Sequence, residues 1–126
     1  MLFRSDPVPR VCIGASGEKI GLPLAGRLAD IWNGSARGTD ADRVRRRDIV
    51  VSAAESAGRD PAEIEMSTTL ERPLPESDQD SEKLVEELEG FVDLGITNLV
   101  MDFGHPPAPE PVLRFVEQVM TPLRTG

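Results

Sequence analysis

Four small residues near the start of the chain have the types and the spacing to bind a phosphate group: Gly14, Ala15, Ser16 and Gly17. They follow an apolar run, Val11 to Ala15, that is typical of a buried strand, and a helical pattern comes after them. Backbone amides in such a turn, together with the positive end of a helix, suit an anion. From these residues alone, a phosphate site and a plain strand-to-helix turn both remain open.

Two better-known motifs do not fit this loop. The spacing of Gly14, Gly17 and Gly21 lacks the second glycine of the dinucleotide fingerprint. Ser16 lacks the glycine two positions later that a nucleophile elbow requires, which makes it a candidate ligand rather than a nucleophile.

Other residues that could do chemistry are isolated. His105 is the only histidine and lies in a proline-rich loop, where an ordinary surface position is the expected role and a catalytic one the alternative. One histidine and one cysteine, Cys12, predict no metal site and no internal disulfide. Trp32 is expected in the core, with a ligand pocket as the alternative. The cluster Arg43, Arg45, Arg46 and Arg47 lies beside Asp40, Asp42 and Asp48 on an expected helix and favours a solvated face over an anion site.

Composition and length disfavour some classes of partner, nucleic acids and membranes among them. The chain has 126 residues with 14 basic and 22 acidic side chains, a net charge of -8, which disfavours nucleic acid as a partner. Its length predicts one domain with a single core. No apolar run is long enough to cross a bilayer and no signal sequence is apparent, so we expect a cytoplasmic protein with no membrane contact.

Strands and helices alternate in the sequence pattern. Strands are expected over Val11 to Ala15, Ala29 to Asn33, Ile64 to Thr69 and Ile96 to Phe103. Four helices are expected: one that begins near Pro23, one that begins at Asp40 after a Thr39 cap, one after a Ser81 cap, and one over Val112 to Leu123. Gly58 and Gly95 are expected to end the second and the third helix in the left-handed conformation.

This order predicts an α/β fold with parallel strands. Eight strand-helix units close a (β/α)8 TIM barrel, so about four units predict a partial barrel or a small open sheet. A half-barrel would leave two edges and one sheet face uncovered, which favours association.

The chain resembles the luciferase-like monooxygenases, which are flavin- or deazaflavin-dependent oxidoreductases built as TIM barrels. The resemblance rests on the strand, Gly-Ala-Ser-Gly and helix order at Val11 to Asn33, on Ala25 to Asp30, on Gly58 to Pro61 and on Asp93 to Ile96. It spans nearly the whole chain in the family's order. Three departures are Ile31 in place of a glycine, the Gly21 and Pro23 pair in the first helix, and the absence of the family's N-terminal half.

The resemblance implies a role for each part. Residues 1–126 would form the C-terminal half of the barrel, and Gly14, Ala15, Ser16 and Gly17 would hold the phosphate of flavin mononucleotide (FMN) or of a deazaflavin such as coenzyme F-420. The partners would be that cofactor, a small organic substrate, and either a second copy (a homodimer) or a complementary N-terminal half. The catalytic residues stay unknown. The alternatives are a half-barrel that binds a ligand or partner without catalysis, and an incomplete gene product.

Overall fold

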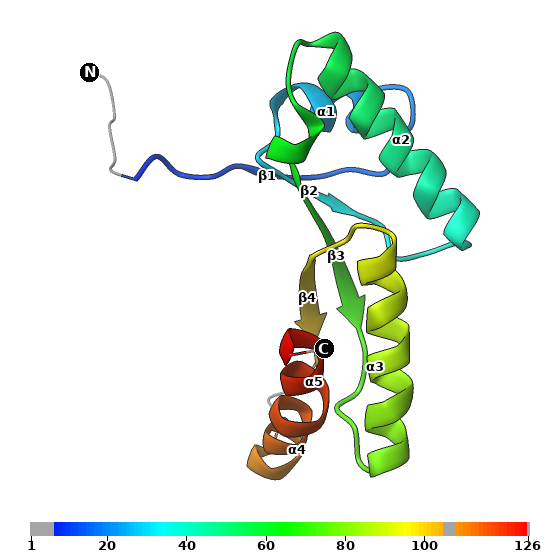
Figure 1. The fold of residues 1–126 in the computed structure, drawn as a ribbon, viewed down its shortest axis with the longest axis vertical. Helices are drawn as coiled ribbons and strands as arrows, with labels where there is room; N and C mark the ends of the chain where they lie inside the picture. The colour runs from blue at the N-terminus through cyan, green and yellow to red at the C-terminus, as the bar shows by residue number, and fades with distance from the viewer. Residues whose placement is uncertain (1–6, 105–107, 126) are drawn as a thin grey trace. The chain divides into compact units, whose positions relative to one another are not determined.

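The structure is a computed structural model that describes residues 7–104 and 108–125. Its strands are β1 (Cys12–Gly14), β2 (Ile31–Gly34), β3 (Glu65–Glu71) and β4 (Asn98–Asp102), in the sheet order β1-β2-β3-β4. The strands are parallel and alternate with helices, as Figure 1 shows. The fold is therefore the α/β class expected from the sequence, a partial (β/α)8 barrel of four strand-helix units.

The helices follow their strands along the chain. They are α1 (Gly21–Leu28), α2 (Asp40–Ser56), α3 (Asp78–Asp93), α4 (Pro109–Phe115) and α5 (Thr121–Thr125), with a 3-10 turn, η1 (Pro61–Glu63), before β3 and a π-helical segment, η2 (Val116–Met120), between α4 and α5. None of the helices in the described residues is long and apolar enough to cross a bilayer.

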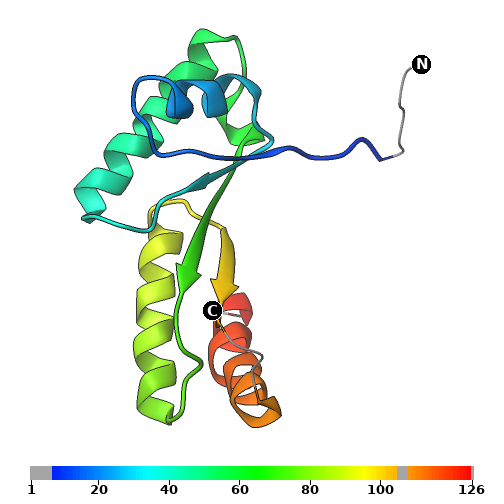
Figure 2. The same cartoon turned by 180° about the vertical axis from the view of Figure 1, so that it is seen from behind.

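The chain divides into two compact units, residues 1–68 (unit 1) and 69–126 (unit 2). In unit 1, α1 and α2 lie side by side (Figures 1 and 2) over a core made by the buried side chains Leu22, Ala25, Ala29, Trp32, Val50, Ala54 and Ile64. Gly26 permits this close approach, because a Cβ atom there would lie 2.4 Å from the Val50 carbonyl oxygen.

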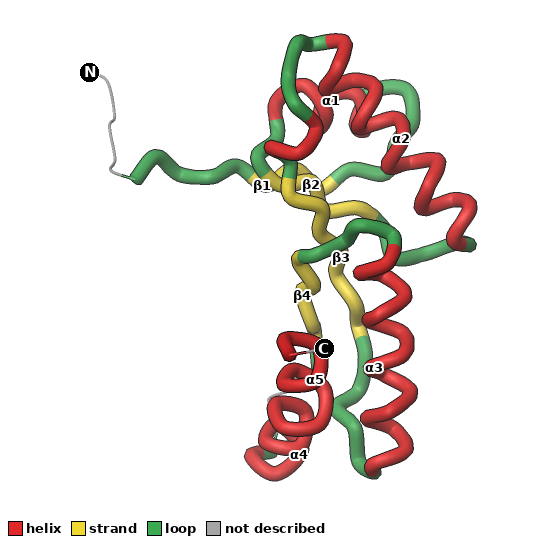
Figure 3. The backbone as a smooth tube through the Cα atoms, viewed as in Figure 1, coloured by secondary structure: helices red, strands yellow, loops and turns green. Residues whose placement is uncertain are grey.

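Unit 2 has its own set of buried apolar side chains: Leu70, Leu84, Leu88, Phe91, Phe115 and Val119. In this unit β4 lies next to β3 (Figure 3), and Phe103 packs edge-on against Phe115 with 5.0 Å between ring centroids. The length of the chain predicts one core, whereas the buried side chains form one set in each unit.

The two glycine stops are confirmed. Gly58 and Gly95 have φ values of +75° and +88°. After α3, the Gly95 amide donates to the Val92 carbonyl and the Ile96 amide to the Phe91 carbonyl, which are the two hydrogen bonds of a Schellman motif. The Thr39 cap is confirmed as well, as a capping box with Asp42.

Two helix starts differ from the expected ones. The cap of α3 is Ser77, which accepts from the Asp80 amide, and Ser81 lies buried one turn inside the helix. The first turn of α3 carries only polar side chains, so the apolar pattern does not reveal it. Helix α1 begins at Gly21, before Pro23, because the first helical amides need no acceptor within the helix and proline is tolerated there.

Candidate functional site: the loop between β1 and α1

The loop Gly14 to Gly17 lies at the carboxyl end of β1, where a barrel of this type places its active-site loops. Gly14, Ser16 and Gly17 are exposed, and Ala15 is half-buried. The four residues expected to contact a phosphate group therefore form one continuous and accessible stretch of backbone.

Three hydrogen bonds fix the path of this loop. The Ala15 amide donates to the Asn33 carbonyl (3.2 Å) at the end of β2, and the Ala15 carbonyl accepts from the Trp32 indole nitrogen (2.9 Å). The Leu22 amide donates to the Gly17 carbonyl (2.9 Å). Trp32 is 5% exposed and belongs to the core, as expected, but its ring also holds the loop, a role that the sequence analysis missed.

The remaining donors of the loop are few and close together. Among the described residues, the amides of Ser16 and Gly17 have no hydrogen-bond partner, and the Ser16 hydroxyl has none either. The start of α1 adds few free donors for an anion. The Leu22 and Leu24 amides already donate to carbonyl groups of the chain, and Pro23 has no amide hydrogen. An anion would therefore be held mainly by Ser16 and Gly17, with less help from the helix than the sequence pattern predicts.

Gly21 allows the loop to lie close to the helix. A Cβ atom at this position would be 3.1 Å from the Cβ atom of Ala15, a distance tighter than nine in ten such contacts. The glycine that departs from the family pattern in the first helix thus permits the loop to pack on α1.

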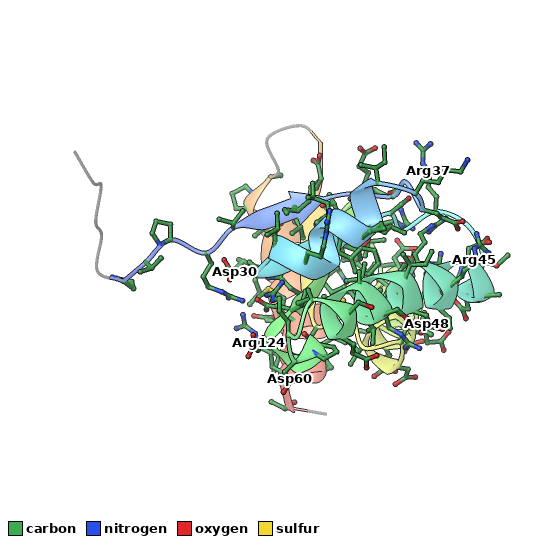
Figure 4. The ribbon with its side chains drawn as sticks, turned by 90° about the horizontal axis from the view of Figure 1, so that it is seen from above. Asp30, Arg37, Arg45, Asp48, Asp60 and Arg124 are labelled. Atoms are coloured by element: carbon green, nitrogen blue, oxygen red, sulfur yellow. The ribbon has the colours of Figure 1, made fainter. Side chains whose placement is uncertain are left out.

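Charges next to the loop are paired. The Arg45 guanidinium on α2 (Figure 4) contacts the Glu18 carboxylate at 2.7 Å and the Asp42 carboxylate at 3.0 Å. These contacts, the one with Glu18 first, raise the pKa of Arg45. Hydrogen bonds from the Thr39 amide and then from Arg45 lower the pKa of Asp42 to about 2. The ion pair reduces the repulsion that Glu18 would otherwise exert on an anion at the loop.

The other arginines of the cluster on α2 contact backbone carbonyls or a neighbouring carboxylate of the same chain. Arg43 donates through Nε to the Ala36 carbonyl (3.1 Å), Arg46 donates to the Arg37 carbonyl (3.0 Å), and Arg47 contacts the Asp48 carboxylate (3.4 Å). Arg43 and Arg46 thereby fix the segment between β2 and α2. These contacts favour a structural role for the cluster over an anion site.

Unit 2 has a hollow at the carboxyl ends of its strands. It is lined by Glu71, Arg72, Pro73, Asp102, Phe103 and Gly104. Arg72 is held by hydrogen bonds to Glu87, which raise the pKa of the arginine. His105, the candidate for catalysis, lies outside the described residues, and no group of three or more metal-binding side chains occurs among the residues that are described.

Comparison with known proteins identifies structural neighbours only. No protein-family model and no curated protein matches the chain. Among solved structures, the coenzyme F420 dependent tetrahydromethanopterin reductase from Methanopyrus kandleri matches with a TM-score of 0.68 and 15% identity, over 89% of this chain and 50% of the reductase. An F420-dependent secondary alcohol dehydrogenase, solved with an F420-acetone adduct, matches with a TM-score of 0.64 and 17% identity, over 86% of this chain and 47% of the dehydrogenase.

The chain thus spans about half the length of the solved structures that it matches. At identities of 15% and 17% the likeness concerns the fold and does not extend to the site residues. The four parallel strands and their helices have the fold of part of an α/β barrel that is found in F420-dependent oxidoreductases.

Proposed function

We propose that the chain binds the phosphate of a deazaflavin coenzyme at Gly14, Ala15, Ser16 and Gly17 and supplies part of the barrel of a luciferase-like, deazaflavin-dependent oxidoreductase. The observation that carries this proposal is the pair of unpartnered amides at Ser16 and Gly17 among the described residues, on a loop fixed by Trp32 and Asn33. Donors that are already oriented lose little entropy when an anion binds.

The deazaflavin is preferred over FMN because both neighbours named above use coenzyme F420. Hydride chemistry on a small organic substrate would belong to the bound coenzyme. This chain's own part is to hold the phosphate and to orient the cofactor, and we place that role in the cytoplasm.

A second candidate is a binding module without catalysis. The loop itself favours it, since glycine, alanine and serine side chains offer no group that exchanges a proton near neutral pH. Such a module would hold a phosphorylated ligand at the same amides and would leave any reaction to another polypeptide.

The test of the site is a titration of the chain with a deazaflavin coenzyme, with FMN and with inorganic phosphate, followed by fluorescence or calorimetry. Gly17→Asp places a carboxylate at the proposed contact and should weaken deazaflavin binding at least tenfold. Gly90→Asp is the matched control, because it adds the same charge on α3, where a Cβ atom meets nothing within 4 Å.

Equal affinities for Gly17→Asp and Gly90→Asp would remove the loop from the site. Binding of phosphate and of both cofactors with similar affinity would support the module instead of the deazaflavin-dependent oxidoreductase.

A further inference from the structure

We propose that the side chain of Asn33, oriented by Ser67, binds the hydroxyl groups of a carbon chain attached to the phosphate at Ser16 and Gly17. The ligand class is therefore a polyol phosphate, which occurs in flavin and deazaflavin coenzymes and also in free sugar derivatives. This inference rests on the phosphate site of the proposed function and adds a second contact to it within unit 1.

The strands of unit 1 place three residues in one row beside the phosphate loop. Gly14, Asn33 and Ser67 are register partners across β1, β2 and β3. Register partners in a parallel sheet direct their side chains to the same face, and adjacent strands lie about 4.8 Å apart. Ser16 follows Gly14 by two residues, a separation of at most about 7 Å. A short carbon chain joined to the phosphate can therefore reach this row.

The next two rows of the same strands lack such groups. The first faces the core and is apolar, with the residues Ile13, Trp32 and Met66. The second returns to the face of Asn33 and has Ile31 on β2. Its β3 residue is Glu65, whose carboxylate pairs with Arg10 at 3.0 Å. Neutral side chains that form hydrogen bonds thus lie in the row nearest the loop.

Ser67 fixes the direction of the Asn33 carboxamide. The Asn33 Nδ2 atom donates to the Ser67 Oγ atom at 3.1 Å. Ser67 is 3% exposed, whereas Asn33 is half-buried, so a ligand reaches the carboxamide rather than the serine. Because Nδ2 is directed toward β3, the Oδ1 atom on the other side of the planar amide is turned away from β3. Oδ1 is the acceptor for a ligand hydroxyl group, and Ser67 is a positioning residue.

Gly14 leaves room for the ligand beside Asn33. Its φ is not positive, so the backbone does not require a glycine there. Beyond its chain neighbours, a Cβ atom at Gly14 would meet only the Asn33 carbonyl oxygen, at 4.0 Å, so packing does not require one either. A β-branched residue suits a strand better than glycine does. The missing side chain keeps space open on the face that carries the Asn33 carboxamide.

Two ligands with five carbon atoms each test the contact. Ribitol 5-phosphate carries hydroxyl groups along its chain, and pentyl phosphate carries none. Calorimetry gives their dissociation constants, and that of inorganic phosphate, for the unmodified chain, for Asn33→Ala and for Ser67→Ala. Ser52→Ala is the matched control for Ser67→Ala, because it removes a hydroxyl group from an exposed position of α2.

The unmodified chain should bind ribitol 5-phosphate at least tenfold more tightly than pentyl phosphate. Asn33→Ala should reduce this preference about tenfold and Ser67→Ala about threefold, the range expected for neutral hydrogen bonds. Ser52→Ala should leave it unchanged. A merely structural role of Ser67 would weaken both ligands equally and would leave the preference as it is.

Gly14→Val tests the course of the carbon chain. Valine suits a strand, so the denaturant midpoint should not fall. Ribitol 5-phosphate should bind at least tenfold more weakly, because the valine side chain occupies the space beside Asn33, and inorganic phosphate should lose a smaller factor. An unaltered affinity of this variant for ribitol 5-phosphate would overturn the proposal.

Three further results would overturn it: equal affinity of the unmodified chain for the two ligands, a preference that Asn33→Ala leaves unchanged, and no binding of either ligand. With inorganic phosphate still bound, the first two would leave the phosphate site of the proposed function in place. A deazaflavin coenzyme that displaces ribitol 5-phosphate, and that Asn33→Ala weakens about tenfold, would identify the coenzyme as the source of the chain. The expected preference without any binding of the coenzyme would support the Asn33 contact with a free sugar phosphate and would contradict the proposed function.

Discussion

The indole nitrogen of Trp32 donates a hydrogen bond to the carbonyl oxygen of Ala15 at 2.9 Å, and this bond joins the core of unit 1 to the candidate phosphate loop. Because the Trp32 side chain is fixed by the core, the path of the loop depends on packing several residues away from the proposed ligand. Loss of the Trp32 donor should therefore change binding as well as stability.

Replacement of Trp32 by phenylalanine separates these two effects. The variant keeps an aromatic ring but loses the donor to Ala15, and we expect it to lower the free energy of unfolding by about 1 to 3 kcal/mol and to weaken cofactor binding. Ile64→Val is the control, since it removes one methyl group from the same core and keeps the Trp32 to Ala15 hydrogen bond. Denaturant midpoints and cofactor titrations measure both. Equal binding by the two variants would show that the hydrogen bond does not organise the loop.

Gly26 and Gly90 form a matched pair for the packing of α1 on α2. A Cβ atom at Gly26 would lie 2.4 Å from the Val50 carbonyl oxygen and 2.7 Å from the Ala53 Cβ atom, whereas one at Gly90 would meet nothing within 4 Å. Gly26→Ala should destabilise the protein by about 1 to 3 kcal/mol, as overpacking does. Gly90→Ala should stabilise it by up to about 1 kcal/mol, because alanine is the better helix former. Similar unfolding midpoints for both variants would contradict the close contact between the helices.

The capping box of α2 predicts a pH dependence. The pKa of Asp42 is lowered from 3.8 to about 2 in the folded chain, chiefly by the hydrogen bond from the Thr39 amide. Between pH 2 and pH 3.8 the carboxyl group of Asp42 therefore binds a proton more readily in the unfolded chain than in the folded one. The contribution of Asp42 to stability is accordingly present above pH 3.8 and is lost as the pH falls toward 2. Asp42→Asn should flatten the fall in the unfolding midpoint over this range. Parallel curves for the variant and the unmodified chain would show that the Asp42 carboxylate does not stabilise the capping box.

The helix ends could be predicted from the sequence because each depends on a few neighbouring residues. Gly58 and Gly95 end their apolar stripes and have positive φ, and Thr39 stands three residues before Asp42. The start of α3 could not be predicted in this way, because its first turn is polar and both Ser77 and Ser81 have the residue type of a cap.

The candidate site was predicted only as a sequence of small residues. Its local pattern could not show that the Ala15 amide is used by Asn33, or that the Leu22 amide is used by Gly17. Nor could it show that Trp32 reaches the loop from the core, since that contact depends on how β2 packs against its helices. The division into two units likewise depends on tertiary packing, which composition and length do not determine.

The most direct measurement of the central claim is the change in amide chemical shifts of a nitrogen-15-labelled chain during titration with a deazaflavin coenzyme. The account predicts that the largest changes occur at the amides of Ser16 and Gly17, that inorganic phosphate moves the same amides in the same direction, and that amides on α3 stay unchanged. Saturable binding with the largest changes elsewhere in the chain, or no change at Ser16 and Gly17 with millimolar coenzyme, would contradict the assignment of this loop as the phosphate site.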